Sequence, residues 1–429
     1  MNDGQGSVQE AELFARRPLY GDILLSVGGR TVAAALTFVK TVVLVRLLAP
    51  PVYGQVAVLL AWGYIASGAT ELGCGAAFIV LESGAPLDQQ HRRFWRFVRT
   101  RLLVSATLMG AWVCTTLLGV PPRSALTGAA LLFGLGQNVC HTPEFLYQVQ
   151  RRFAPYARFV VGVALVQLAW SAGALAAYRV WHLSDETLWW LLALAPWSAN
   201  LVGLVPLALQ DHRLLAPQIG EDWAYLKTMV AFGKWVALCG LLAYVYQRWA
   251  VIALGKTGNP EAAGAYDVAL TCGQVVNMLT LAAVSALSPR FAATHERAAV
   301  RRGLVRLFTR GGPVVALVLV VYYLVRRTVI ATVFGPHYLA SIVPLDALMP
   351  SFVLTLLTLP MVAYTTYGLR APQVVFWVAL GRTALLVLGA YPATQHYGVL
   401  GLAVLQSALG IGEHLLVTLY ALYAPRRSR

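Results

Sequence analysis

Residues 23–48 read ILLSVGGRTVAAALTFVKTVVLVRLL, a run of 26 residues in which apolar side chains predominate. The hydrocarbon core of a bilayer is roughly 30 Å thick, and about 20 apolar residues of α-helix cross it. The run is therefore long enough to span a membrane as one helix. Its only charged residues are Arg30, Lys40 and Arg46, and the first two lie well inside it.

The composition of the whole chain also favours a membrane environment over water. Hydrophobic residues make up 58% of the 429 residues and charged residues only 12%, with a mean hydropathy of +0.65. A soluble domain of this size would have to expose large apolar surfaces. Alternating strands of about ten residues, which a membrane barrel requires, are absent. We therefore predict an all-α integral membrane protein, since a helix satisfies its backbone polar groups internally.

The apolar runs predict about twelve transmembrane helices. The predicted spans cover 23–48, 54–82, 99–119, 124–148, 157–179, 188–210, 228–254, 263–288, 305–326, 340–366, 371–393 and 398–424. Six crossings return a chain to its starting side, so we expect two pseudo-symmetric six-helix lobes around a central cleft. Gly29-Arg30 in the first span and Gly233-Lys234 in the seventh are a faint sign of this repeat.

The positions of the basic residues predict the topology. Of the 33 Lys and Arg residues, 22 fall at the termini or at every second connection, six at the intervening connections and five inside predicted spans. This asymmetry is the positive-inside pattern, so the net charge of +15 does not indicate a nucleic-acid partner. The expected organisation is a cytoplasmic tail over 1–22, an N-lobe over 23–210, a cytoplasmic linker over 211–227, a C-lobe over 228–424 and a cytoplasmic tail over 425–429.

Four cations inside the predicted spans are the candidate binding residues: Arg30 and Lys40 in the first span, Lys234 and Arg248 in the seventh. A cation at the bilayer centre costs on the order of 3 kcal/mol, so each needs a cavity or a partner. Within each span the two cations fall on one face of the helix. One interpretation is a water-filled cleft whose cations bind an anionic ligand such as phosphate. The other is that Arg30 and Arg248 snorkel to the interfaces, an alternative that also applies to Arg382.

Four carboxylates also lie inside predicted spans: Glu71, Glu144, Asp267 and Glu413. Each is a candidate proton or sodium site for ion coupling, because burial raises the pKa of a carboxyl group. Structural pairing with a cation is an equally good interpretation.

No catalytic, cofactor or metal motif is present. The chain lacks a Walker loop, GxSxG, HExxH and zinc-finger spacings, and its five cysteines form no CxxC pair. We expect no enzyme activity, no catalytic residues, no cofactor and no metal site.

Five short stretches, in order along the chain, carry a family resemblance. Residues 45–57 read VRLLAPPVYGQVA and residues 71–77 read ELGCGAA. In the second half, GAYDVA at 264–269, Ser288-Pro289 and FGPHY at 334–338 follow in order. This pattern resembles the bacterial polysaccharide flippases, the O-antigen (lipopolysaccharide) and exopolysaccharide exporters of the multidrug/oligosaccharidyl-lipid/polysaccharide superfamily. The chain departs from that family late in the seventh span, where it has YQRWA at 246–250 in place of a polar pair with an acid.

The resemblance implies a multi-pass protein of the bacterial inner membrane with both termini in the cytoplasm. It would move undecaprenyl-diphosphate-linked oligosaccharides between leaflets by alternating access, without covalent chemistry. Its expected partners are the lipid-linked oligosaccharide, membrane lipids and other polysaccharide-assembly proteins.

Three alternatives remain at this point. A multidrug or ion antiporter of the same superfamily should have an anionic or apolar cleft. A membrane-embedded polysaccharide polymerase or ligase should carry a large extracytoplasmic loop. A scaffold that transports nothing should have a sealed, apolar interface between its halves.

Overall fold

The first span is a single helix, α2 (Leu19–Leu47). Its 29 residues make it about 44 Å long at a rise of 1.5 Å per residue, longer than a hydrocarbon core is thick. It ends before Pro50-Pro51, which begin the first turn of α3 (Pro50–Glu71), a position where the missing N–H of proline costs nothing. Along its length α2 packs against α8 (Phe153–Val180).

The structure is a computed structural model that describes residues 19–118, 124–210, 219–274, 302, 305, 309, 312–369 and 371–423. Over these ranges the secondary structure is helical, without a strand, which confirms the predicted fold class. The parts of the predicted organisation that lie outside the described residues are the first tail up to residue 18, residue 119 of the third span, residues 211–218 of the linker, residues 275–288 of the eighth span, residues 306–308, 310 and 311 of the ninth, residue 424 of the last span, and the last tail.

Several predicted spans divide into shorter helices. The span 54–82 is α3 followed by α4 (Cys74–Glu82), 124–148 is α6 (Ala125–Cys140) and α7 (Thr142–Val149), and 188–210 runs through α9 (Asp185–Ala193), α10 (Ala195–Ser198), η1 (Ala199–Leu201) and α11 (Leu204–Gln210). The other elements are α5 (Leu87–Leu117), α12 (Ile219–Lys256), a helix over 260–274, α15 (Gly312–Val333), η4 (Pro336–Ser341), α16 (Ile342–Ala363), η5 (Tyr364–Gly368) and α17 (Pro372–Tyr423).

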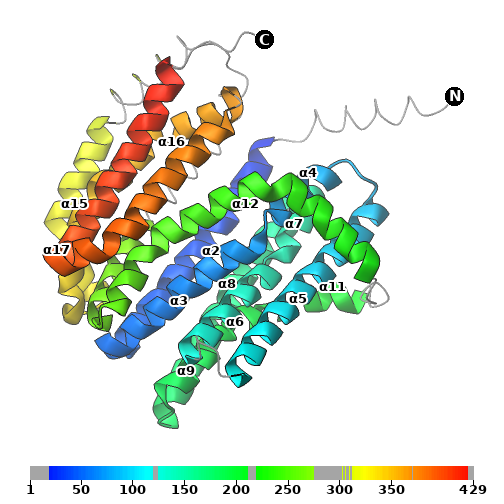
Figure 1. Cartoon of the computed structure of the whole chain (residues 1–429), viewed down its shortest axis with the longest axis horizontal. Helices are drawn as coiled ribbons and strands as arrows, with labels where there is room; N and C mark the ends of the chain where they lie inside the picture. Colours follow the sequence, from blue (N-terminus) through cyan, green and yellow to red (C-terminus); the bar gives the residue numbers. More distant parts are fainter. Residues whose placement is uncertain are drawn as a thin grey trace.

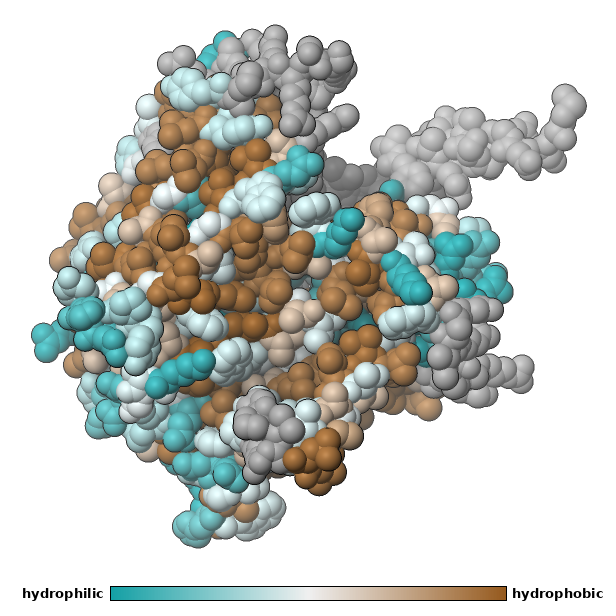
Figure 2. Space-filling model, in the orientation of Figure 1, coloured by the Kyte–Doolittle hydropathy of each residue, from teal (hydrophilic) through white to brown (hydrophobic). Residues whose placement is uncertain are grey.

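The outer surface is apolar over a wide area. In the described part of the chain, seven helical segments are long and apolar enough to cross a membrane: Pro50–Glu82, Leu87–Leu117, Phe153–Val180, Asp222–Lys256, Val315–Val333, Pro336–Thr358 and Pro372–Tyr423. Figure 2 shows hydrophobic residues covering much of one face. Exposed side chains such as Phe232 and Trp235 on α12 and Leu317 and Leu324 on α15 require lipid rather than water around them. The protein is therefore a multi-pass membrane protein.

The element α17 contains two helices. Its 52 residues include Gly398, whose φ of 61° and ψ of −150° are not helical. The Arg382 guanidinium donates to the Glu413 carboxylate, and a Cβ atom added to Gly389 would lie 2.9 Å from the Leu405 side chain. Both pairs are nearly symmetrical about Gly398, so the two arms run antiparallel as a helical hairpin. This arrangement agrees with the two predicted spans, 371–393 and 398–424.

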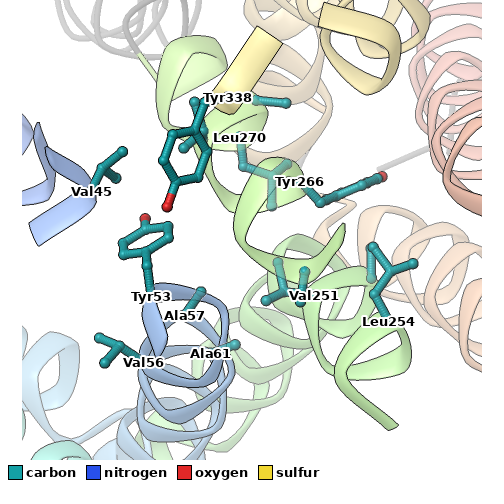
Figure 3. Close-up of a cluster of buried hydrophobic side chains, with 14 of the residues drawn as sticks. Val45, Tyr53, Val56, Ala57, Ala61, Val251, Leu254, Tyr266, Leu270 and Tyr338 are labelled. Atoms are coloured by element: carbon teal, nitrogen blue, oxygen red, sulfur yellow. The ribbon is translucent and has the colours of Figure 1, made fainter. Parts of the chain in front are cut away.

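Two groups of helices are joined by α12. In Figure 1, α15, α16 and α17 lie together at one side, while α2, α3, α5, α6 and α8 lie at the other, and α12 runs across both. We call residues 19–210 the N-terminal half and residues 260–423 the C-terminal half. The start of α3 meets the C-terminal half in a buried core that includes Tyr53, Ala57, Val251, Tyr266 and Tyr338 (Figure 3).

The break between α3 and α4 lies against α12. The Glu71 carboxylate accepts the backbone N–H groups of Gly73 at 2.7 Å and Gly75 at 2.8 Å, donors that the helix break frees. Leu72 and Gly73 have positive φ values of 54° and 69°. A Cβ atom added to Gly73 would lie 2.1 Å from the Gly233 carbonyl oxygen, so only glycine allows α12 to approach this closely.

This contact makes a stability prediction. We expect Gly73→Ala to lower the thermal unfolding temperature of the purified protein in detergent, followed by tryptophan fluorescence, more than Gly84→Ala does. Both glycines have positive φ, so both substitutions bring backbone strain of about 1–2 kcal/mol. An added Cβ atom at Gly84 meets nothing within 4 Å, so Gly84→Ala measures the cost of the backbone strain without a steric clash. Equal shifts for the two variants would contradict the close approach.

Candidate functional site

A polar cavity lies inside the N-terminal half. This first cavity has a volume of about 390 Å³, and its wall includes Arg30 and Lys40 from α2 together with residues of α3, α5, α6, α7 and α8. Tyr244 of α12 closes one side. The two cations predicted on one face of the first span therefore do line a common cavity.

Arg30 lies at an exposed position of the first cavity. Its Nε atom donates a hydrogen bond to the Tyr156 hydroxyl of α8, and its guanidinium carbon lies 5.7 Å from the Tyr156 ring centroid. The phenol fixes the direction of the side chain without neutralising its charge, because a hydroxyl carries none. Arg30 keeps donors that can bind a ligand oxygen.

Lys40 is a deeply buried cation in the wall of the first cavity. Its side chain is only 6% exposed, and within the described residues it makes no hydrogen bond or ion pair. A buried ammonium group without a counter-charge is unfavourable, so such a group is expected where an anion or water can enter. The Lys40 ammonium group is thus a free positive charge in the wall of the first cavity.

The carboxylates of the first cavity are already bound. Glu71 caps α4 and also forms an ion pair with Arg101 at 3.4 Å. Glu144 pairs with His141, three residues earlier. Three cations, Arg30, Lys40 and Arg101, therefore face two carboxylates in the lining, which leaves the cavity net positive even with His141 neutral.

Arg101 is a cavity residue that the sequence analysis missed. It lies at the start of the predicted span 99–119 and was not among the candidate binding residues, but it is only 7% exposed and donates to the Asn138 carbonyl oxygen. Its guanidinium carbon lies 4.5 Å from the Phe97 ring centroid and 5.3 Å from that of Phe145. The signal was the helical spacing of Phe94, Phe97 and Arg101, which places the arginine on the buried face of α5.

A second cavity lies in the C-terminal half and has a volume of about 300 Å³. Its two cations are paired: Arg248 binds Asp267 at 3.0 Å, and Arg382 binds Glu413. The Tyr53 hydroxyl of α3 also donates to Asp267, at 2.6 Å. The charges of this second cavity therefore cancel.

The four predicted cations do not all line one cavity. Arg30 and Lys40 line the first and Arg248 the second, while Lys234 is exposed on α12 and lines neither. Lys234 and Arg248 share a helical face, but α12 has 38 residues and packs against different helices along its length. A common face on so long a helix does not imply a common environment. The binding roles of all four residues remain predictions.

The four candidate coupling acids divide between the cavities. Glu71 and Glu144 line the first cavity, Glu413 lines the second, and Asp267 reaches Arg248 in its wall. Glu71, Asp267 and Glu413 pair with arginines and Glu144 with His141, and ion coupling stays an untested prediction. The described residues contain no group of three or more His, Cys, Asp or Glu side chains that could hold a metal ion.

The two cavities adjoin at α12. The Arg248 guanidinium carbon lies 4.6 Å from the ring centroid of Tyr64, and Tyr64 lines the first cavity. Tyr244 lines the first cavity and Tyr246 the second. Two residues turn a helix by about 200°, so these tyrosines point to opposite sides of α12.

Solved structures share this fold at low sequence identity. An inward-facing multidrug resistance MATE family transporter of the MOP superfamily matches with a TM-score of 0.67 and 12% identity, over 90% of this chain and 93% of its own. The lipid II flippase MurJ in an inward closed conformation matches with a TM-score of 0.66 and 10% identity, over 93% and 87%. A MOP superfamily transporter from Pyrococcus furiosus, described as having a binding pocket of reverse polarity, matches with a TM-score of 0.61 and 12% identity, over 93% and 94%.

No curated protein sequence matches the chain. The sequence profile of a family described as polysaccharide biosynthesis protein matches residues 20–295, which is more than half of the chain. The resemblance carried by the first two spans and by the ordered stretches of the second half is thus confirmed: this multi-pass membrane protein, with the fold of the MOP superfamily transporters, belongs to the polysaccharide biosynthesis protein family.

Proposed function

We propose that this protein is a flippase that moves undecaprenyl-diphosphate-linked oligosaccharides from the cytoplasmic to the periplasmic leaflet of a bacterial inner membrane. In this proposal both termini are cytoplasmic, and the protein is a transporter rather than an enzyme. The observation that carries the proposal is the net positive first cavity with Lys40 in its wall, buried and without a counter-charge. A diphosphate supplies the negative charge that this cavity lacks.

The alternatives fit the cavities less well. An exporter of cationic drugs needs a cavity with an excess of negative charge, whereas in the first cavity three cations face two carboxylates and in the second both arginines are paired with acids. A polymerase or ligase needs room outside the membrane, but only residues 181–184 connect α8 to α9. A scaffold with a sealed apolar interface does not account for two polar cavities.

Contacts between the halves suggest how access alternates. By the proposed topology, the start of α3 lies at the periplasmic end, where Tyr53 binds Asp267. A Cβ atom added to Gly54 would lie 1.8 Å from the Pro260 carbonyl oxygen, so the two backbones touch. In the proposed cycle these contacts close the periplasmic end while the cytoplasmic end receives substrate, and they separate when the halves rock apart.

Transport itself can be measured in liposomes. Purified protein reconstituted with a fluorescent undecaprenyl-diphosphate-linked oligosaccharide should accelerate its exchange between leaflets well above the rate in protein-free vesicles, measured by the accessibility of the fluorophore to a membrane-impermeant quencher. Vesicles containing the Lys40→Met variant at the same protein density are the control. An exchange rate equal to that of empty vesicles would refute the flippase function.

The role of Lys40 can be tested by binding. Lys40→Met keeps the side-chain length and removes the charge, so we expect about a tenfold to hundredfold weaker affinity for undecaprenyl diphosphate, the loss typical of one charged hydrogen-bond donor. Lys227→Met removes the same charge from an exposed position of α12 and should leave the affinity unchanged. Native mass spectrometry in detergent measures both. Equal affinities for the two variants would argue against Lys40 as the anion site.

The periplasmic contact makes a separate prediction. Gly54→Ala should prevent full closure, because the new methyl group meets the Pro260 backbone, and it should lower the liposome exchange rate. A cysteine introduced at the buried Ala57 should then react faster with a membrane-impermeant maleimide added from the periplasmic side. Gly110→Ala on α5, where an added Cβ atom meets nothing within 4 Å, is the control. Unchanged labelling in Gly54→Ala would show that this contact does not close the periplasmic end.

A further inference from the structure

The second cavity has a composition that suits an uncharged polar ligand. Two guanidinium groups, from Arg248 and Arg382, stand in its wall and disfavour a cationic ligand. Both are neutralised by carboxylates, Asp267 and Glu413, so neither offers a free charge to an anion. A ligand that suits this cavity is therefore uncharged and can form many hydrogen bonds.

The hydrogen-bonding groups of the second cavity include several that carry no charge. The amides of Gln247 and Gln274 and the hydroxyl of Ser351 line it. His414 is 7% exposed and its Nε2 atom is 2.9 Å from the Thr355 hydroxyl, while its Nδ1 atom has no hydrogen-bond partner among the described residues. A buried nitrogen without a partner is costly and points to a ligand or water that would satisfy it.

Aromatic and apolar surface accompanies these groups. Phe352 and Tyr246 line the same cavity, and Tyr246 is held in place because its hydroxyl donates to the Gln406 carbonyl oxygen at 2.6 Å. A sugar ring presents hydroxyl groups at its edge and C–H groups on its faces, so it matches amides and hydroxyls beside aromatic rings. The volume of about 300 Å³ is at the lower end of the range for small-molecule sites.

From these observations we infer that the second cavity is a carbohydrate-binding site for uncharged sugars. The inference rests on the proposed function: the diphosphate of the lipid-linked oligosaccharide would bind in the first cavity and its neutral sugars in the second. The two cavities adjoin where Arg248 lies over Tyr64, 4.6 Å from the ring centroid, so the two parts of one ligand would bind at neighbouring surfaces. The C-terminal half then recognises the glycan and the N-terminal half the anion.

Cys239 provides a native reporter, because its half-buried side chain lines the second cavity. Full-length protein in lipid nanodiscs is treated with N-ethylmaleimide, and alkylation of each cysteine is followed by peptide mass spectrometry. Two probes are compared at saturation: undecaprenyl diphosphate, and undecaprenyl diphosphate bearing the neutral disaccharide di-N-acetylchitobiose. We expect the glycosylated probe to slow Cys239 alkylation several-fold more than the sugarless probe. Cys114, exposed on α5 away from both cavities, should react equally in all samples.

The double variant Gln247→Leu/Thr355→Val should abolish the difference between the probes while leaving the affinity for undecaprenyl diphosphate unchanged. Thr332→Val, on the exposed face of α15, is its control. If both probes bind and protect Cys239 equally, or if the double variant keeps the difference, the carbohydrate site is refuted and the flippase proposal stands. If neither probe binds, the flippase proposal fails. Free di-N-acetylchitobiose at millimolar concentration then decides the site: protection of Cys239 supports it, and no protection overturns it.

Discussion

A charged side chain inside a bilayer has no water to solvate it, and this constraint organises the interior of the protein. Most of its embedded charges meet the constraint by pairing: Arg101 with Glu71, Arg248 with Asp267, and Arg382 with Glu413. Lys40 does not, although it is as deeply buried as any of them. The paired charges need no ligand, whereas the unpaired ammonium group of Lys40 is expected where an anion or water can enter the first cavity.

Each ion pair also joins helices that apolar packing alone would hold together less firmly. Glu71 binds the N–H groups freed at the break between α3 and α4 and then receives Arg101 from α5. The pair of Arg382 and Glu413 ties the arms of the α17 hairpin. Asp267 takes both Arg248 and the Tyr53 hydroxyl, so it joins α12 to the start of α3. Removing one partner of such a pair would leave a buried charge unmatched, which is far more costly than losing a surface pair.

The sequence predicted the helices better than it predicted the cavities. Apolar run length is a local property, and α2, α5 and α8 agree with their predicted spans to within a few residues, apart from the basic start of α5. The predicted span begins only at residue 99, because the basic residues Arg92, Arg93 and Arg96 precede it, and Arg101 at its start was not recognised as a buried residue. The breaks at Leu72-Gly73 and His141 were not predicted either. The first is stabilised by Glu71 and by the close approach of α12, whereas the second had a local signal in Pro143, which lies in the first turn of α7.

The candidate site shows the same division between local and tertiary information. Arg30 and Lys40 could be placed together because both belong to one helix whose face turns toward one neighbour, α8. Lys234 and Arg248 also share one face of a helix, but they do not line a common cavity, because α12 packs first against α4 and α5 and later against α3 and α17. The partners of three of the four acids could likewise not be identified, since those of Asp267, Glu413 and Glu71 lie 19 to 31 residues away along the chain.

The central position of α12 gives the proposed alternation a physical basis. Its Gly233 touches the helix break at Gly73 in the N-terminal half, and its Arg248 binds Asp267 of the C-terminal half. Between these points Tyr244 faces one cavity and Tyr246 the other. A helix transmits a rotation along its axis because its backbone hydrogen bonds keep it stiff. In the proposed cycle, a movement of α12 that separates Asp267 from Tyr53 would therefore also change the wall between the first and second cavities, so that opening the periplasmic end and reshaping both cavities would be a single event.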